Sequence, residues 1–484
     1  MPGGAALIDP RGAGSAPNMA GKVKGPESRF EAVNLLSDPL YQYCSITKQR
    51  ADGAGSEEAL LDHPWLQRQR RIHQLQSAWW VFHTAEHSRF QHAVGAMHLT
   101  GTFTEHLYSS LVESCPDAPS RQLVVETMRI AGLLHDIGHG PFGHFFDVEV
   151  LAQYGLDHED IGRRLVLGPL AELIAAIRRS PDGDFAQGEA ILPEWVAWVM
   201  APRELDGFEP PLWLRALKPV LCGPASTDNM DYVPRDAYMC GVAVGPVDLA
   251  RLRHYMFIKD GNLVLHQHGA PALEMFLSAR LYMYNHVYFH RTVRRIDLHL
   301  RPVFARTCEA LLPPGNPLDH LDQYLLLTDW SLMTEVERLQ RQPRNDQERE
   351  LGRHWEAVTS RRLPWRLAFE AYRELSQPNS PAGLSNSSQI EALIRSALPA
   401  QFKGVGLEVD LASTAPRPDN PASDDQMLRL FDPISGRVEA GAARELLARL
   451  LPVRTVWLRV YSDSFEAREA IREAAVRTMP GVLA

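Results

Sequence analysis

The segment AGLLHDIGHGPFGH, residues 131–144, concentrates one titratable residue type: His135, His139 and His144 stand here together with Asp136. Imidazole nitrogens and carboxylate oxygens form a ligand set that suits Zn²⁺, Mn²⁺, Fe²⁺ or Ni²⁺. A bound cation of this kind polarises phosphoryl oxygens and turns water into hydroxide near neutral pH. A single histidine is more often a hydrogen-bonded structural residue, so it is the cluster that indicates metal-assisted chemistry.

The spacing inside this segment lets the side chains share one cleft. Apolar residues at helical spacing precede it in LVVETMRIAGLL, residues 123–134, and predict a helix that runs up to the cluster. His139 follows His135 by four positions and Asp136 by three, so the three side chains lean the same way on a helical turn. The glycines and the proline of GHGP then break the helix and permit a tight turn, which returns His144 to the same place.

Three further segments complete a recognisable order of motifs. EHSRFQHAVGAMHL precedes AGLLHDIGHGPFGHFFD, and DHE and TDNMDYVPRDAYMCGV follow it. Between about residues 37 and 295 this order resembles the HD-domain superfamily of metal phosphohydrolases, and most of all its deoxynucleoside triphosphate (dNTP) triphosphohydrolases. The resemblance implies a mainly α, HD-domain helical fold. It also implies that water attacks the α-phosphorus of a dNTP, which releases the deoxynucleoside and inorganic triphosphate.

The resemblance implies four metal ligands in the order H…HD…D. They fall on His92, His135, Asp136 and Asp228, while Asp231 is expected to pack a helix or to support a ligand. Taken alone, Asp228 equally suits a helix N-cap. The implied cofactor is one divalent transition metal (Mn²⁺, Fe²⁺, Zn²⁺, Ni²⁺ or Co²⁺), with additional Mg²⁺ accompanying the nucleotide.

The resemblance also assigns the acid–base groups. His139, His144 and His158 match phosphate-contacting and acid–base histidines, and His158 is expected to protonate the leaving 5′ oxygen. A general acid needs a pKa near the working pH, which histidine offers. Asp147 and Glu159 are expected to orient it, although Glu159 on its own equally suits an exposed helix surface.

Contacts to the nucleotide follow from the same matches. They are Arg89 beside the α-phosphate, Gln74 and Leu75 at the sugar edge, Tyr232 at a phosphate, Asp236 at the 3′ hydroxyl, and Arg280 and Tyr288 as a phosphate arginine and a sugar-stacking tyrosine. A tyrosine beneath the 2′ carbon excludes a ribose hydroxyl by its bulk and so favours deoxy substrates. Without the resemblance, Tyr288 is equally well explained as an aromatic residue of a helix core.

Two positions depart from the family pattern. Asn229 stands where close relatives carry lysine or arginine, and Phe289 where a glutamine is expected. Asp62 and Arg70 fall at positions that bind guanine in an activating nucleotide between subunits, although exposed residues of these types usually only solvate a surface. This match predicts a homo-oligomer (dimer, tetramer or hexamer) whose assembly a nucleotide promotes.

Two other functions remain open at this stage. Because Asn229 removes a phosphate cation, a nucleotidase or phosphodiesterase that acts on other phosphate esters is an alternative. A non-catalytic sensor of nucleotides or single-stranded nucleic acid is a third, which the intact H…HD…D set disfavours.

Composition limits the classes of protein. The formal net charge is −9, and no long basic run is present, so nucleic-acid binding is possible but not indicated. The five cysteines form no C-x-x-C pair, which fits a reducing compartment. No apolar stretch reaches the roughly 20 residues of a membrane span, and no signal peptide is evident, so a cytoplasmic location is expected.

The elements that must position these residues are predicted to be mostly helical. Residues 1–28, rich in Gly, Ala and Pro, are expected to form a disordered leader, residues 29–395 a helical HD domain, and residues 396–484 a small α+β lobe. A long helix is predicted over residues 270–300, and a β-hairpin around the Asp260-Gly261 dipeptide.

Overall fold

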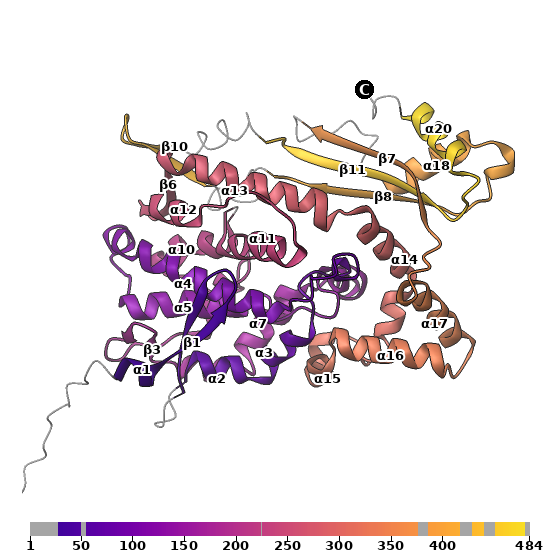
Figure 1. Cartoon of the computed structure of the whole chain (residues 1–484). Coiled ribbons are helices and arrows are strands. Elements are labelled where there is room, and N and C mark those ends of the chain that lie inside the picture. Colours follow the sequence, from indigo (N-terminus) through magenta and orange to yellow (C-terminus); the bar gives the residue numbers. More distant parts are fainter. Residues whose placement is uncertain are drawn as a thin grey trace, which may run out of the picture.

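The computed structural model describes residues 28–49, 55–223, 225–375, 386–416, 428–439 and 451–479. Helices dominate this part of the chain (Figure 1), which confirms the predicted mainly α fold class. The predicted leader lies, up to residue 27, outside the described residues. No helix of the described ranges is both long enough and apolar enough to cross a bilayer.

A β-hairpin that the sequence analysis did not predict stands near the start of the described chain. Strands β1 (Val33–Asp38) and β2 (Gln42–Thr47) pair antiparallel. The side chain of Asp38 accepts hydrogen bonds from the backbone N–H groups of Leu40 (2.8 Å) and Tyr41 (3.1 Å). Such an Asx turn supplies locally the reversal that the two strands need.

Two packed helices carry the first half of the site. Helix α4 (Arg89–Ser114) begins at a capping box, and helix α5 (Arg121–Leu134) begins at Ser120, whose side chain caps it. The two pack against each other, and α11 (Thr227–Cys240) packs against α4. Helix α5 ends directly before the histidine cluster, as the apolar spacing predicted.

Shorter elements surround this pair. They are α1 (Ser28–Ala32), α2 (Glu57–Asp62), α3 (Pro64–Arg68), α6 (His144–Phe146), α7 (His158–Leu167), α8 (Ala171–Ala175), β3 (Arg179–Ser180), β4 (Gly183–Asp184), α9 (Pro193–Val199), α10 (Leu212–Cys222) and α12 (Leu249–Tyr255). Beyond the site, α15 (Leu321–Leu326), α16 (Asp329–Arg341) and α17 (Asp346–Thr359) follow.

The long helix predicted over residues 270–300 is two helices. Helix α13 (Ala270–Met283) passes into a π-helical turn (Tyr284–Tyr288), and α14 (Arg291–Cys308) starts after it. His290 caps α14, because its side chain accepts a hydrogen bond from the N–H of Thr292. Both halves have helical spacing, so the pattern alone did not show the break between them.

The predicted hairpin at residues 256–266 is present and belongs to a larger sheet. Strands β5 (Met256–Lys259) and β6 (Asn262–His266) pair antiparallel, which confirms the prediction. Strand β9 (Arg429–Asp432) joins β6 in parallel, and β10 (Arg437–Glu439) joins β9. The C-terminal residues thus extend a sheet that starts within the helical domain.

A second sheet lies across one side of the molecule (Figure 1). Its order is β7 (Arg366–Leu375), β11 (Arg454–Ser462) and β8 (Leu407–Thr414), and all the pairs are antiparallel. Helices α18 (Ser387–Ala397) and α20 (Arg468–Thr478) pack on it around a separate apolar core. The sequence analysis placed β7 on the helical side of residue 396, whereas its pairing joins it to the C-terminal sheet.

Candidate metal centre and substrate cavity

Four side chains converge where α4, α5 and α11 meet. Nε2 of His92 lies 3.2 Å from Nε2 of His135 and 3.1 Å from Oδ1 of Asp228. Nε2 of His135 lies 3.4 Å from the same Asp228 oxygen, and Asp136 approaches His92 and His135 to 3.8 Å and 3.5 Å. Donors about 2.1 Å from one cation stand roughly 2.9–3.4 Å apart, so the separations among His92, His135 and Asp228 suit a shared ion, with Asp136 slightly farther out.

The proton positions support the same conclusion. Nδ1 of His135 faces the carbonyl oxygen of Gly132 at 2.9 Å, and Nδ1 of His92 faces a carboxylate oxygen of Asp231 at 2.8 Å. An oxygen acceptor places the ring proton on Nδ1, which leaves the Nε2 lone pairs to face each other and Asp228. A proton or a metal cation between them relieves this repulsion, so the arrangement is compatible with a divalent cation.

The electrostatic environment agrees with that assignment. Burial alone would lower the pKa of His92, but hydrogen bonds and charge from Asp228 and Asp231 outweigh it and raise the pKa to about 10. In the same way the carboxylates raise the pKa of His135 against its burial. The pocket therefore favours positive charge at this point.

Asp231 anchors the first ligand to the N-terminal hairpin. Its carboxylate is fully buried and accepts hydrogen bonds from both Nε (2.8 Å) and Nη2 (2.9 Å) of Arg235. The hydroxyl of Tyr41 donates to it at 2.8 Å, and Arg235 also pairs with Asp38 at 2.9 Å. Carboxylates of this kind fix the orientation of a ligating imidazole. Of the two roles predicted for Asp231, the structure favours support of a ligand.

The alternative that Asp228 is an N-cap is wrong. Ser226 caps α11, because its side chain accepts a hydrogen bond from the N–H of Asn229 at 3.2 Å. Asp228 therefore sits in the first turn of the helix, where its side chain is available to the two histidines.

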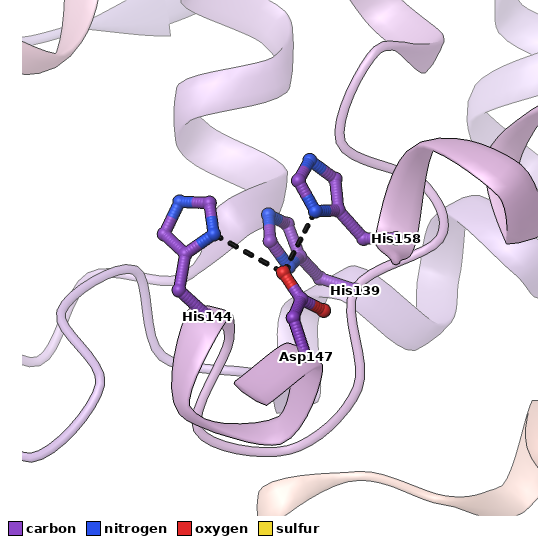
Figure 2. Close-up of side chains that lie close together, drawn as sticks. All are labelled: His139, His144, Asp147 and His158. Atoms are coloured by element: carbon purple, nitrogen blue, oxygen red, sulfur yellow. Dashed lines mark hydrogen bonds and ion pairs between the residues drawn. The ribbon is translucent and has the colours of Figure 1, made fainter. Parts of the chain in front are cut away.

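A second cluster, drawn in Figure 2, adjoins the first, because Nε2 of His139 lies 3.4 Å from Oδ1 of Asp136. Nδ1 of His158 lies 2.8 Å from Oδ2 of Asp147, and Nδ1 of His144 lies 3.1 Å from the same oxygen. His139 is fully buried, and its ring stacks on that of His158 with centroids 3.7 Å apart. His144 is exposed.

The pKa values of the two stacked histidines are shifted in opposite directions. Burial lowers the pKa of His158, but the hydrogen bond and charge of Asp147 outweigh this and raise it. For His139, burial and the charges of Arg89 and His158 hold the pKa well below its usual range. His158 is thus the member of the pair that holds a proton more readily, and its Nε2 lies 3.9 Å from Asp136.

A tight turn brings the two clusters together. A Cβ on Gly138 would lie 2.0 Å from the backbone oxygen of His158, so only glycine permits this approach to α7. Phe142 has a φ of 62°, and its N–H is held by Asp329 at 2.9 Å. The buried Arg68 donates to the carbonyl oxygen of His139 at 2.7 Å.

A cavity of about 500 Å³ opens over the metal centre. Every predicted metal ligand lines it, and so do the following predicted residues: Gln74, Leu75, Arg89, His144, His158, Glu159, Tyr232, Asp236, Arg280 and Tyr288. Nη1 of Arg89 lies 2.6 Å from Asp136. The hydroxyl of Tyr288 donates to Asp236 at 2.7 Å, so Tyr288 belongs to the cavity wall and not only to a helix core.

Four predicted residues stand away from the cavity lining. His139 and Asp147 lie behind the lining residues: Nε2 of His139 lies 3.4 Å from Asp136, and Asp147 contacts both His144 and His158. Asp62 and Arg70 are exposed at the surface, and the guanidinium of Arg70 lies 3.6 Å above the ring of Phe90.

The sequence analysis assigned no role to several supporting residues. His87 contacts Asp236 at 2.8 Å, and Arg68 and Asp329 hold the turn of the histidine segment. Arg68 and Asp329 lie 71 and 187 residues from their partners in that segment, so no local spacing points to them. His87 stands in a histidine-rich stretch, which is the one signal that was available.

Comparison with known families matches two parts of the chain. Residues 89–194 match the HD domain, and residues 247–394 match the HD associated region. His92, His135 and Asp136 fall within the first match, and Asp228 lies between the two matches. The chain thus contains an HD domain and an HD associated region, which confirms the resemblance seen in the motifs.

Two relatives illustrate how far the similarity extends. The uncharacterized protein YwfO of Bacillus subtilis is 30% identical over 282 residues, 58% of this chain and 57% of that protein. The deoxynucleoside triphosphate triphosphohydrolase SAMHD1 of Homo sapiens is 42% identical over 117 residues, 24% of this chain and 17% of that protein. The chain spans 57–64% of the length of YwfO and of two further curated relatives.

Solved structures share the fold. A hypothetical protein from Aquifex aeolicus superimposes with a TM-score of 0.65 at 24% identity, covering 91% of this chain and 99% of that chain. A phosphohydrolase from Bacteroides thetaiotaomicron gives a TM-score of 0.61 at 22% identity over 88% of this chain and 99% of that chain. At these identities the similarity shows a shared fold alone.

Proposed function

We propose that this protein is a metal-dependent dNTP triphosphohydrolase. The observation that carries the proposal is the single cavity that joins the four-ligand centre to two arginines, Arg89 and Arg280, and to His158. A divalent cation at the centre supplies a Lewis acid and an activated water for attack on phosphorus. The similarity to SAMHD1, whose name records this activity, supports the choice of substrate.

The chain's own residues have separate tasks in this reaction. Arg89 and Arg280 neutralise charge on the phosphates, and Arg280 is placed by a hydrogen bond of its Nε to the hydroxyl of Tyr232 (3.2 Å). His158, held through Nδ1 by Asp147, keeps its Nε2 proton for the leaving 5′ oxygen. His139 stacks behind it and fixes the plane of the ring.

The sugar is held at the middle of the cavity. Asp236 accepts from Tyr288 at 2.7 Å and contacts His87 at 2.8 Å, which fixes its carboxylate for the 3′ hydroxyl. Tyr288 lines the cavity, and stacked beneath the sugar its ring would exclude a ribose 2′ hydroxyl, so deoxy substrates are favoured.

The product identifies the reaction. Purified protein is incubated with each dNTP and each NTP in the presence of Mn²⁺, Co²⁺ or Mg²⁺. Inorganic triphosphate and deoxynucleoside in equal amounts are the expected products. Pyrophosphate with a nucleoside monophosphate, or no reaction with any dNTP, would overturn the proposal.

Asn229 supports a second candidate, a nucleotidase or phosphodiesterase. It lines the cavity as a neutral residue beside Asp228, where relatives carry a cation. Orthophosphate released from nucleoside monophosphates, or an opened cyclic dinucleotide, would favour this candidate over the first.

We further propose that the protein forms a homo-oligomer that an activating nucleotide promotes. Asp62 and Arg70, the two residues assigned to this site, are exposed and so accessible to a second subunit. Light scattering with and without dGTP tests the proposal. A mass that stays unchanged while the protein is active would count against it.

A further inference from the structure

One part of the substrate cavity, its second end, is lined by α14 and the turn before it and not by predicted metal ligands. Phe289, Val293 and Asp297 line it at four-residue spacing, which places them on one face of α14 and the turn before it. Gln76 and Ala78 line it as well, and Nε2 of Gln76 donates to Asp297 at 3.0 Å. Among the described residues, none of these side chains makes a hydrogen bond or ion pair with a predicted metal ligand.

Arg294 is the one arginine at this end, and the C-terminal sheet holds it. Its Nε and Nη2 donate to Oδ1 of Asp410 on β8 at 3.1 Å and 2.7 Å, and Nε also lies 3.2 Å from Oδ2. Asp410 is 2% exposed, whereas Arg294 keeps 22% of its side chain exposed at the cavity. This bidentate pair fixes the plane of the guanidinium.

The third nitrogen of that guanidinium is available for a ligand. Nη1 makes no hydrogen bond within the described part of the chain and lies 3.7 Å from Oδ2 of Asp297. Asp297 is occupied on its other sides, because it accepts from the hydroxyl of Ser77 and, at 3.0 Å, from Nε2 of Gln76. The end of the cavity thus presents one oriented guanidinium nitrogen, paired with Asp297 only at 3.7 Å, beside the apolar side chains of Phe289, Val293 and Ala78.

Further contacts make the sheet part of the same wall. The hydroxyl of Tyr461 donates to the carbonyl oxygen of Arg291 at 2.8 Å, and Nε1 of Trp457 donates to Asn285 at 3.0 Å. Both partners lie on the turn and helix that carry Arg294. The sheet is therefore hydrogen-bonded to the segment that forms this end of the cavity.

We propose that Arg294, oriented by Asp410 of the C-terminal sheet, recognises the nucleobase. This proposal rests on the proposed function and adds the substrate class that this end selects. A nucleobase is flat and neutral, which suits the walls of Phe289, Val293 and Ala78. Its keto oxygens and ring nitrogens accept hydrogen bonds, which suits Nη1 of Arg294. A second phosphate does not suit this end, because Asp297 lies beside it.

The test compares the kinetics of substrates that differ only in their base. Each of dGTP, dATP, dTTP and dCTP is assayed with the wild type, Arg294→Met and Asp410→Asn, and KM and kcat are determined separately. In both variants the ratio of kcat/KM between the best and the poorest base falls about tenfold, which corresponds to about 1.4 kcal/mol. The change lies in KM. An unchanged ratio overturns the proposal.

A matched variant separates docking of the sheet from recognition of the base. Tyr461→Phe removes one hydrogen bond between the sheet and α14 but leaves the Arg294–Asp410 pair intact. It is expected to lower the melting temperature while the ratio between bases stays at the wild-type value. If Tyr461→Phe changes the ratio as much as Asp410→Asn does, the effect is structural and the proposal is wrong.

Calorimetric binding of the four deoxynucleosides distinguishes this proposal from the proposed function. If the wild type hydrolyses no dNTP but binds deoxynucleosides with a preference that Asp410→Asn removes, the function is wrong and base recognition stands. If dNTPs are hydrolysed with ratios that neither variant alters, base recognition is wrong and the function stands. If no deoxynucleoside or dNTP binds, both are wrong.

Discussion

Replacing Asp231 by Asn tests whether the N-terminal hairpin supports the metal centre. The carboxylate of Asp231 holds Nδ1 of His92 at 2.8 Å and so keeps its Nε2 lone pair toward the centre. Asparagine keeps one side-chain oxygen but loses the negative charge. Its N–H₂ group would face His92 or Arg235, and both of these are hydrogen-bond donors to Asp231 in the wild type. Loss of a partner of this kind typically weakens metal affinity 10–100-fold, about 1.4–2.7 kcal/mol.

The same substitution has a cost in folding stability. Arg235, 2% exposed, would lose one of its two carboxylate partners and keep Asp38 at 2.9 Å. Breaking a buried ion pair costs about 3–5 kcal/mol. Because Arg235 still pairs with Asp38, we expect a loss near the lower value. The free energy of unfolding should therefore fall by about 3 kcal/mol together with the metal affinity.

The assay measures both quantities in two variants. The apparent Kd for Mn²⁺ is obtained by competition with a chromogenic chelator, and the free energy of unfolding by urea denaturation. Asp38→Asn is the matched control, because Asp38 pairs with Arg235 but does not touch His92. It should lose stability and keep metal affinity. Equal affinities in Asp231→Asn and wild type, or equal losses in both variants, would refute the reasoning.

Three further predictions concern the turn, the ligands and a distant buried acid. Gly138→Ala should displace α7 and lower kcat at least 100-fold, because the new Cβ would lie 2.0 Å from the oxygen of His158; a steady-state assay with wild-type kinetics would contradict this. His135→Ala should abolish both hydrolysis and bound metal as measured by plasma emission, and retention of either would refute its role as a ligand. Burial and the charge of Glu57 raise the pKa of Glu126 well above its usual value, so its stabilising neutral form is lost as pH rises through that raised pKa. Glu126→Gln should therefore gain melting temperature relative to wild type as pH increases from 5 to 8, and a gain that is independent of pH would contradict the cause.

Local patterns predicted the parts of the fold that depend on neighbours in sequence. The apolar spacing predicted α5 up to Leu134, and the Asp260-Gly261 dipeptide predicted the hairpin of β5 and β6. These signals suffice because helix faces and tight turns are decided within a few residues. The break between α13 and α14 was missed, because a π-helical turn preserves the apolar spacing on both sides.

The candidate site was likewise predictable from sequence only in part. Motif order singled out His92, His135, Asp136 and Asp228, because a metal site requires particular side chains and these stand in a recognisable sequence. Tertiary structure decided that their nitrogens and oxygens converge, since 136 residues separate the first from the last. Spacing along a chain carries no information on contacts at that separation.

The sequence by itself determined the chemistry of this protein: a helical chain with histidines and aspartates suited to a divalent cation. Only the tertiary structure decided which groups support that chemistry. Asp231 reaches Tyr41 of the N-terminal hairpin, and Arg294 reaches Asp410 of the C-terminal sheet, across 190 and 116 residues of chain. The physical reason is that residue type fixes what a side chain can do, whereas burial and packing between distant elements fix where it does so.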